Sequence, residues 1–327
     1  MNILVTGACG FIGSHLVEKL VKENHNVRAF TFYNSRNSHG WLDNVDKKIL
    51  KDLDLISGDI RDYDFLYQQT KKIDVIIHLA ALIGIPYSYH AVKSYIDTNV
   101  TGTYNVLNSA KINNVSKTTI TSTSEVYGTA QKVPILENHP LSAQSPYAAS
   151  KIAADQLALS FYKSYGLSLT IMRPFNTFGP RQSARAIIPT IITQLLSRKE
   201  EINLGDLSPT RDFCYIQDTV NGFIEIEKSE NTIGEEINIS SQQEISIHDL
   251  SSKIINLINP NAKIIYDENR KRPNNSEVDR LLGSNKKLKE LTQWKQQYDL
   301  ISGLKETIEW FKQKANIKQY KSDIYNV

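Results

Sequence analysis

The chain is 327 residues long, and 40% of its residues are hydrophobic while 22% are charged. This composition is typical of a globular protein and excludes an intrinsically disordered one. The 38 basic and 35 acidic residues leave a net charge of +3, which argues against bulk nucleic-acid binding. Two cysteines, Cys9 and Cys214, are too few for a disulfide framework and fit a reducing compartment.

No apolar run approaches the roughly 20 residues that a membrane-spanning helix requires. The segment Met1–Gly7 lacks the basic stretch and the small-residue cleavage site of a secretory signal. We therefore expect a soluble, cytoplasmic protein with neither a membrane nor a nucleic acid as partner.

Segments rich in β-branched residues alternate with helical patterns through the first half of the chain. Strands are predicted at Asn2–Thr6, Asn26–Thr31, Leu53–Ser57, Asp74–Leu79, Thr118–Ser122 and Leu167–Met172. Helices are predicted at Phe11–Glu23, Tyr63–Lys71, Val92–Ile112 and Tyr147–Tyr165. This alternation predicts an α/β protein with a doubly wound parallel sheet of the Rossmann type.

After about Arg173, prolines and glycines separate shorter elements. Helices are predicted at Ile187–Arg198, Gln217–Glu227, Ile247–Ile258 and Ser302–Phe311, and the polar tail Ala315–Val327 is expected to fray. We therefore expect a dinucleotide-binding domain over residues 1–172 and a smaller mixed α/β substrate lobe over residues 173–327. Some segments of the second half are expected to return to the first domain.

A glycine-rich turn stands between the first strand and the first helix. Glycines let the backbone approach a pyrophosphate, and the helix N-terminus attracts its charge. A turn that only packs the helix on the sheet would also need glycines, but the strand before it and the helix after it favour a dinucleotide site. The predicted NAD(P) contacts in this turn are Gly7, Gly10, Phe11, Ile12 and Gly13.

The second strand ends without the acidic residue that usually binds the ribose in NAD sites. No Asp or Glu occurs from Asn24 to Leu42, and Thr31 stands where the acid is expected. Small polar residues beside Arg36 suit a 2′-phosphate, which favours NADP, although Arg36 could also be a solvated loop charge. The predicted contacts here are Thr31, Asn34, Ser35 and Arg36, with Asp59 and Ile60 beside the adenine unless Asp59 only caps a helix.

Tyr147 and Lys151 form a Y-x-x-x-K pair at the start of a predicted helix. Residues four apart share a helix face, so the ammonium could stabilise a phenolate and lower the tyrosine pKa. Such a tyrosine can take a hydroxyl proton while hydride leaves the same carbon. An exposed pair on a helix surface is the alternative that this common pattern allows.

Three polar residues, Thr123, Ser124 and Glu125, follow the strand that ends at Ser122. Doubly wound sheets place ligands at the carboxyl ends of their parallel strands. Thr123 could therefore bond a sugar hydroxyl, and Glu125 could act as a base or merely satisfy backbone donors of a turn. The Y-x-x-x-K pair some twenty residues on favours the catalytic role.

The glycine turn, Thr123 and the Tyr147/Lys151 pair together resemble the extended short-chain dehydrogenase/reductase family. Segments His78–Ala81, Asp97–Val100 and Arg173–Gln182 match as well, so the resemblance covers the chain to about Phe311. It implies a nucleotide-sugar enzyme without a metal, and a homodimer whose subunits join the two long helices in a four-helix bundle. On the cofactor side it implies contacts at Leu79, Ala80, Ala81 and Asn99, with Asn99 ordering a helix or a water relay.

Glu125 separates the activities within this family. Simple sugar 4-epimerases usually carry a small residue there, whereas the string Thr123–Gly128 is similar to that of GDP-mannose-type 4,6-dehydratases and of UDP-glucuronate decarboxylases. Ser124 departs from the Thr-Asp-Glu of dTDP-glucose dehydratases, so a separate acid for the departing C6 hydroxyl is not implied. Segments Leu82–Tyr89, Ser183–Thr190 and Ser208–Phe213 look most like the legionaminic-acid dehydratases of bacteria, which act on GDP- or UDP-N-acetylglucosamine.

The resemblance implies a 4,6-dehydratase with a role in surface glycan synthesis. Its substrate contacts would be Ser88, Thr123, Asn176, Arg185, Arg211 and Arg272. Asn176 would contact the diphosphate, and Arg211 and Arg272 would pair with phosphate or nucleotide unless they form surface ion pairs. A uronate decarboxylase, a 4-epimerase and a non-catalytic nucleotide-sensing module remain as alternatives.

Overall fold

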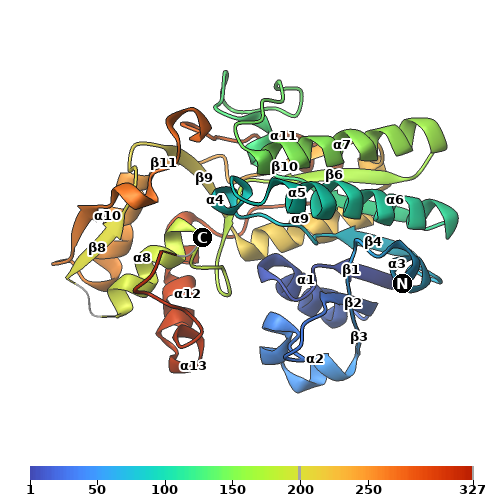
Figure 1. Ribbon diagram of the computed structural model, residues 1–327, viewed down its shortest axis with the longest axis horizontal. Coiled ribbons are helices and arrows are strands. Elements are labelled where there is room, and N and C mark those ends of the chain that lie inside the picture. Colours follow the sequence, from blue (N-terminus) through green and yellow to red (C-terminus); the bar gives the residue numbers. More distant parts are fainter. Residues whose placement is uncertain (198–199, 326–327) are drawn as a thin grey trace.

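A computed structural model describes residues 1–197 and 200–325 of the chain. A seven-stranded parallel sheet lies at its centre, in the order β10-β6-β5-β4-β1-β2-β3 (Figure 1). The strands are β1 (Asn2–Thr6), β2 (Asn26–Phe32), β3 (Leu53–Gly58), β4 (Val75–His78), β5 (Lys117–Thr121), β6 (Leu169–Pro174) and β10 (Glu236–Ile239). The predicted doubly wound parallel sheet is confirmed, and the six predicted strands lie within two residues of their expected bounds.

Helices cover both faces of this sheet, which is why β1 and β4 at its centre are mainly apolar and almost entirely buried. On one face, α1 (Phe11–Lys22) packs against α9 (Ile216–Lys228). The other face carries α3 (Tyr63–Gln69), α6 (Gly102–Ile112) and α7 (Pro146–Tyr165). Each face of the sheet has its own buried apolar cluster.

The long helix predicted at Val92–Ile112 forms in three parts. It begins as α5 (Val92–Tyr95), widens into a π-helical segment over Ile96–Thr101 and continues as α6. Such π segments often mark functional sites because they turn one side chain out of the normal helical register. Here Asn99 is buried within the π segment.

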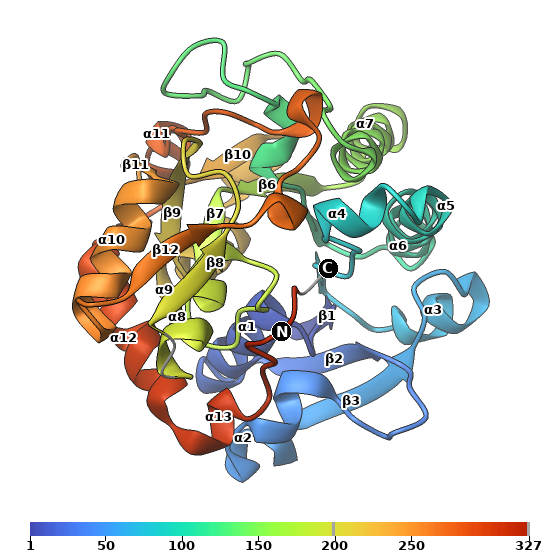
Figure 2. The same cartoon turned by 60° about the vertical axis from the view of Figure 1, so that its left-hand side comes forward.

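Smaller sheets build the second half of the chain (Figure 2). The strands β7 (Asn176–Phe178), β9 (Thr210–Tyr215) and β11 (Glu244–Ser246) form a three-stranded sheet, and β8 (Glu201–Leu204) pairs with β12 (Lys263–Tyr266). The helices are α8 (Ile187–Leu196), α10 (Ile247–Ile258), α11 (Lys286–Leu291), α12 (Leu300–Lys312) and α13 (Lys314–Ile317). The predicted end of one helix, at Arg198, lies outside the described residues, as do the last two residues of the tail.

Short elements complete the chain. They are α2 (Lys47–Lys51) and α4 (Ile85–Ser88), and the 3₁₀ turns η1 (Gly40–Asn44), η3 (Ser124–Tyr127), η4 (Glu230–Thr232), η5 (Glu268–Arg270) and η6 (Asn274–Ser276). The strand β10 comes from the second half and pairs with β6 in the central sheet. A division into domains at residue 172 stays a prediction. Of the helices in the described residues, none is both long and apolar enough to cross a membrane.

The tail that is expected to fray makes contacts with distant segments in the part that the structure describes. Tyr320 lies in an aromatic cluster with Trp41, Trp310 and Phe311, at ring-centroid distances of 6.1, 6.3 and 4.8 Å. Its hydroxyl donates to the Gln182 carbonyl at 2.9 Å. The composition of the tail is polar, but its Tyr320 ring packs against an aromatic cluster formed by residues outside the tail.

Candidate active site

A cavity of about 1210 Å³ lies between the carboxyl ends of the central strands and the second half of the chain. Its wall includes the glycine turn after β1, the loop after β4, the polar triplet after β5 and the first turns of α7. Pockets for a single drug-sized ligand usually enclose about 300–1,000 Å³. This cavity is therefore large enough for a dinucleotide and a second ligand together.

The glycine turn at one end of the cavity has a shape that only glycine allows. Gly7 has a φ of +69°, and a Cβ there would stand 2.7 Å from the Ala80 nitrogen. A Cβ on Gly13 would stand 2.2 Å from the Gly7 carbonyl oxygen. Gly10 has no side chain to cap α1, so the first amides of that helix remain available to an anion at the cavity wall. This backbone fits the pyrophosphate of a dinucleotide.

The cofactor contacts predicted after β2 do not reach the wall. Thr31 is buried, with its hydroxyl 3.2 Å from both the His39 ring and the Ile56 carbonyl. The Asn34 amide donates within its own loop, to the Ser38 carbonyl at 2.7 Å, while Ser35 and Arg36 are exposed. None of these four lines the cavity. Direct contacts of Thr31, Asn34, Ser35 and Arg36 with a bound cofactor therefore stay a prediction.

Three other residues near β2 do line the cavity. Phe32, Ser38 and Asp43 line this end of the cavity, and the Asp43 carboxylate accepts from the Ser38 hydroxyl at 2.7 Å. Asp43 lies one residue beyond the stretch that contains no acid, so the sequence search stopped just short of it. Asp59 and Ile60 do line the cavity, and the Arg61 guanidinium holds the pKa of Asp59 below its usual value.

Of the residues expected after β4, the wall includes Leu79, Ala80 and Ala81, whereas Asn99 is behind them. The Asn99 amide accepts from the Leu82 nitrogen at 2.8 Å and donates to the Leu82 carbonyl and the Ser150 hydroxyl at 2.9 Å. Asn99 therefore orders the loop after β4, and a direct cofactor contact does not fit its buried position.

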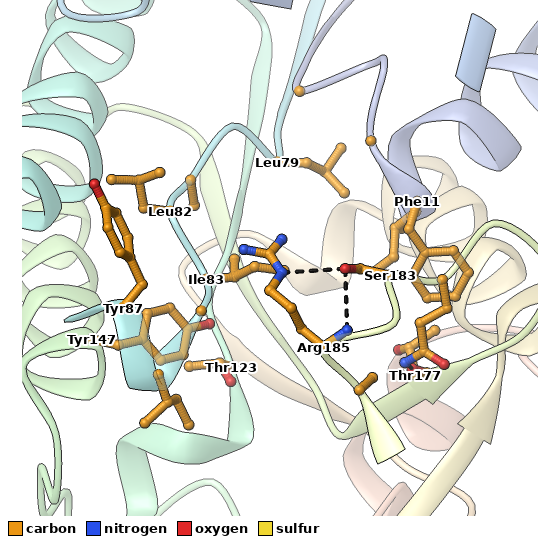
Figure 3. A pocket seen from close by; sticks show the side chains of 18 of the residues that line it. Phe11, Leu79, Leu82, Ile83, Tyr87, Thr123, Tyr147, Thr177, Ser183 and Arg185 are labelled. Carbon is orange, nitrogen blue, oxygen red and sulfur yellow. Dashed lines mark hydrogen bonds between the residues drawn. The ribbon is translucent and has the colours of Figure 1, made fainter. Parts of the chain in front are cut away.

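Thr123, Ser124, Glu125, Tyr147 and Lys151 all line one stretch of the wall. The triplet is held by η3, whose cap Thr123 accepts from the Glu125 amide at 3.2 Å. Tyr147 and Lys151 lie in the first turns of α7, where Ser145 caps the helix and accepts from the Ala148 amide at 3.1 Å. Figure 3 shows the Tyr147 hydroxyl directed toward Thr123 at the centre of the cavity. The structure thus brings together two motifs that lie some twenty residues apart.

Burial sets the electrostatics of this group. It raises the pKa of the Tyr147 phenol, a hydrogen bond with Thr123 acts in the opposite direction, and the Glu125 charge raises the pKa further. Burial also lowers the pKa of Lys151, which Asp155 opposes, and Lys151 Nζ donates to the Thr121 carbonyl at 2.6 Å. The pKa of Tyr147 is therefore raised in the protein alone, and not lowered as expected from the Lys151 ammonium.

Charged residues gather toward the opposite end of the cavity. Arg211 and Arg272 line it and share the Glu277 carboxylate, at 2.8 and 3.3 Å. Burial lowers the pKa of Arg272, but the charges of Glu277 and Glu125 outweigh it and the pKa is raised. The Arg272 guanidinium is thus close enough to Glu125 for the charge of that carboxylate to act on it.

Of the remaining predicted substrate contacts, Asn176 and Arg185 line the cavity and Ser88 does not. Asn176 lies on the wall, and its buried Oδ1 has no partner among the described residues. Arg185 crosses the cavity, where its Nε donates to the Ser183 hydroxyl at 3.2 Å (Figure 3). Ser88 is buried off the wall and donates to the Ile85 carbonyl at 2.7 Å, so a direct substrate contact does not fit.

Sequence reasoning missed several wall residues, among them Arg270, Gln319 and Tyr325. No motif marks them, and two come from the tail that was expected to fray. Among the described residues, no cluster of three or more His, Cys, Asp or Glu side chains is arranged to hold a metal ion.

Comparisons with known proteins agree with this arrangement. Residues 4–307 match the family described as GDP-mannose 4,6 dehydratase. A putative UDP-glucose 4-epimerase of Methanocaldococcus jannaschii is 32% identical, covering 95% of this chain and 98% of that protein. The UDP-N-acetyl-alpha-D-glucosaminuronate decarboxylase of Bacillus cytotoxicus is 33% identical, covering 96% and 98%. The solved structure of the dTDP-glucose 4,6-dehydratase DesIV from Streptomyces venezuelae, with NAD and TYD bound, has a TM-score of 0.85 at 27% identity, covering 96% and 98%.

Proposed function

Since the chain belongs to the GDP-mannose 4,6-dehydratase family, within the extended short-chain dehydrogenases/reductases, we propose that it is a nucleotide-sugar 4,6-dehydratase. Its proposed substrate is GDP- or UDP-N-acetylglucosamine, and its product is the 4-keto-6-deoxy sugar nucleotide. One observation carries the proposal: Glu125 lies on the same wall as Tyr147, near enough for its charge to act on the phenol. A carboxylate at that position supplies the base that elimination needs and that simple epimerisation does not.

The oxidation of the sugar at C4 begins at Tyr147. The phenol oxygen takes the proton of the C4 hydroxyl, and Thr123 beside it holds that hydroxyl in place. Because burial raises the pKa of Tyr147, the phenolate needs positive charge nearby, which Lys151 provides one helical turn along α7. A nicotinamide dinucleotide, which Gly7, Gly10 and Gly13 would hold at the glycine turn, would supply the acceptor and donor of hydride for this reaction.

The elimination of water then depends on Glu125. The C4 ketone acidifies the C5 hydrogen, which Glu125 removes as a proton. The C6 hydroxyl leaves and takes that proton from the same carboxyl group, since Ser124 offers no second acid. C5 finally regains the proton that Tyr147 took from the C4 hydroxyl. The sum is the loss of one water with no net oxidation.

A uronate decarboxylase is the second candidate, and Arg185 favours it. Among the described residues, no carboxylate lies within salt-bridge distance of this guanidinium, which reaches the loop after β4. A cation at that place would suit a C6 carboxylate. The 4-epimerase is disfavoured because it would leave Glu125 without a task, and a non-catalytic sensor would not need Tyr147 and Lys151 on the wall.

Product mass separates these candidates. The purified protein, supplied with NAD, would be incubated with GDP- and UDP-N-acetylglucosamine and with the matching uronates. We expect loss of one water from at least one of the N-acetylglucosamine donors. Loss of carbon dioxide from a uronate would establish the decarboxylase instead. Conversion without any change in mass would indicate an epimerase and refute the role of Glu125.

For the cofactor we propose NAD, although the absence of an acid up to Leu42 favours NADP. The residues behind that preference do not line the cavity, whereas the Asp43 carboxylate does and would repel a 2′-phosphate. Calorimetric titration should therefore show tighter binding of NAD than of NADP. The Asp43→Asn variant should bind the two cofactors with more similar affinities. Tighter binding of NADP by the unaltered protein would restore the prediction made from the sequence.

We also propose a homodimer through a four-helix bundle. Exposed apolar side chains gather on α5, the π segment, α6 and α7, which lie side by side in Figures 1 and 2. They are Val92, Ile96, Tyr104, Ile112, Tyr162 and Tyr165. Contiguous apolar patches of this kind commonly mark interfaces. Light scattering after size exclusion should give twice the chain mass, and a monomer at micromolar concentration would contradict the proposal.

The proposed place of action is the cytoplasm, in the synthesis of surface glycans. Cys9 and Cys214 are both free, as expected in a reducing compartment. Fractionation of cells that express the protein would test this location.

A further inference from the structure

The tail after α12 packs against residues from both halves of the chain. Tyr320 stacks on Trp41 at 29° between ring planes, and Trp41 donates its backbone amide to the Cys9 carbonyl of the glycine turn at 3.1 Å. On its other side Tyr320 meets Trp310 and Phe311 of α12. The tail is therefore fixed to the pyrophosphate turn and to the second half of the chain at one residue.

Beyond this anchor the tail runs from α13 back toward the middle of the molecule, as the red trace in Figure 2 shows. Gln319 and Tyr325 line the wall. The Tyr325 ring lies over the Arg270 guanidinium, 5.0 Å from its centroid, and 36% of the residue is exposed. Tyr325 is thus held in a fixed position by a cation–π contact while part of its surface remains free.

Three other groups face the Tyr325 ring. Burial raises the pKa of its phenol, the charges of Arg272 and Arg270 oppose that shift, and Tyr89 and Asp267 add to it. Arg270 pairs with Asp267 at 2.9 Å and Arg272 with Glu277 at 3.3 Å. The tail therefore adds an aromatic ring to two arginines on the cavity wall.

An aromatic ring beside two guanidinium groups suits a nucleoside diphosphate. Guanidinium groups pair with phosphate oxygens, and an aromatic ring stacks on a nucleobase whatever its identity. Given the proposed function, on which this step rests, we propose that the C-terminal tail completes the nucleotide subsite of the substrate. Tyr325 covers the nucleobase, and the Tyr320 anchor holds the tail across the cavity.

Direct binding of GDP and of UDP tests this role without requiring turnover. Titration calorimetry is done with NAD at saturation, so that the dinucleotide end is filled. Loss of one base-stacking ring weakens nucleotide binding roughly five- to hundred-fold. We therefore expect Tyr325→Ala to weaken binding of both nucleotides by about ten-fold. Tyr325→Phe keeps the ring and should bind as the unaltered protein does.

Tyr33→Ala is the matched control, because Tyr33 is 67% exposed in the loop after β2 and does not line the cavity. It should leave GDP and UDP binding unchanged. In steady-state assays Tyr325→Ala should raise KM for the nucleotide sugar and leave kcat as it is. A thermal melt of each variant establishes that the fold is intact.

The outcomes separate this inference from the proposed function. A protein that dehydrates a nucleotide sugar, and whose Tyr325→Ala variant binds GDP and UDP normally, overturns the inference alone. A protein that binds these nucleotides through Tyr325 but dehydrates no nucleotide sugar overturns the proposed function alone. Tighter binding by Tyr325→Ala would mean that the tail blocks the subsite, and failure of the unaltered protein to bind either nucleotide also refutes the inference.

Discussion

Replacing Glu125 with glutamine should separate the oxidation of the sugar from the elimination of water. The substitution keeps the volume of the side chain and removes its charge and its basicity. The structure indicates that the fold tolerates it, since Thr123 still accepts from the backbone amide of residue 125. Arg272 also keeps its ion pair with Glu277 at 3.3 Å, so no buried cation loses its only partner.

The expected size of the effect follows from the role of a positioned base. Proton transfer by such a group contributes about 10²- to 10⁴-fold in rate, or about 3–5 kcal/mol of barrier. Turnover by Glu125→Gln should fall within that range. Reduction of bound NAD by the substrate should persist, because Tyr147, Thr123 and Lys151 are unaltered.

A change in pH dependence should accompany this loss. Burial is the main cause of the raised Tyr147 pKa, but the Glu125 charge adds to it. Without that charge the phenolate persists to lower pH, so reduction of NAD by Glu125→Gln should extend to more acidic solutions than in the unaltered protein. The near-ultraviolet absorbance of the reduced nicotinamide, recorded in single-turnover mixing across pH, measures both the step and its profile.

The control is Glu309→Gln, which makes the same chemical change on an exposed face of α12. It should leave turnover and the pH profile unchanged. Normal release of the 6-deoxy product by Glu125→Gln would refute the proposed role of this carboxylate and with it the assignment as a dehydratase.

Four further outcomes are expected. Tyr147→Phe should abolish reduction of bound NAD by the substrate, and reduction at the normal rate would exclude the phenol as base. Gly7→Ala should lose NAD affinity in calorimetric titration and cost more than about 2 kcal/mol of stability, because its φ is +69° and its Cβ would meet Ala80; normal NAD binding would show that the turn adapts. Asp155→Asn should cost about 3 kcal/mol in urea unfolding, since it removes one of two carboxylates from the fully buried Arg173, and an unchanged midpoint would mean that the other carboxylate suffices. Burial lowers the pKa of His15 to about 4, so acidification from pH 6.5 to 4 should destabilise the protein, because the imidazole of the unfolded state takes up a proton that the folded state does not. In His15→Gln the melting temperature should fall less steeply over this pH range. An equally steep fall would exclude His15 as the cause.

Local patterns predicted those parts of the molecule that local interactions determine. The buried run of β1 and the glycines after it form a strand and a turn because no other backbone fits them. Thr123–Glu125 and the Tyr147/Lys151 pair could be assigned to one site because the carboxyl ends of parallel strands meet at one edge of a sheet. These inferences needed no knowledge of distant contacts.

The predictions that do not fit depend on contacts between distant segments. The loop after β2 reverses at Asn37, with a φ of 53°, so Ser38 and Asp43 reach the cavity in place of Asn34 and Arg36. The tail packs on the rest of the protein because Tyr320 stacks on Trp41, which lies nearly 280 residues earlier in the chain. A local sequence pattern cannot predict a contact over that separation. Spacing predicts which residues share an element, and it cannot say which way a loop turns.

Charges of alternating sign extend from the reaction centre into the core of the protein. Lys151 lies beside Asp155, whose carboxylate accepts from the Arg173 guanidinium at 3.0 Å, and Arg173 also pairs with Glu236. Burial lowers the pKa of Lys151, while the Asp155 charge opposes that shift. The buried Asp155–Arg173 pair is costly to form, and its position behind Lys151 gives it a task. The Asp155 charge favours the charged form of Lys151, the ammonium on which the proposed mechanism relies.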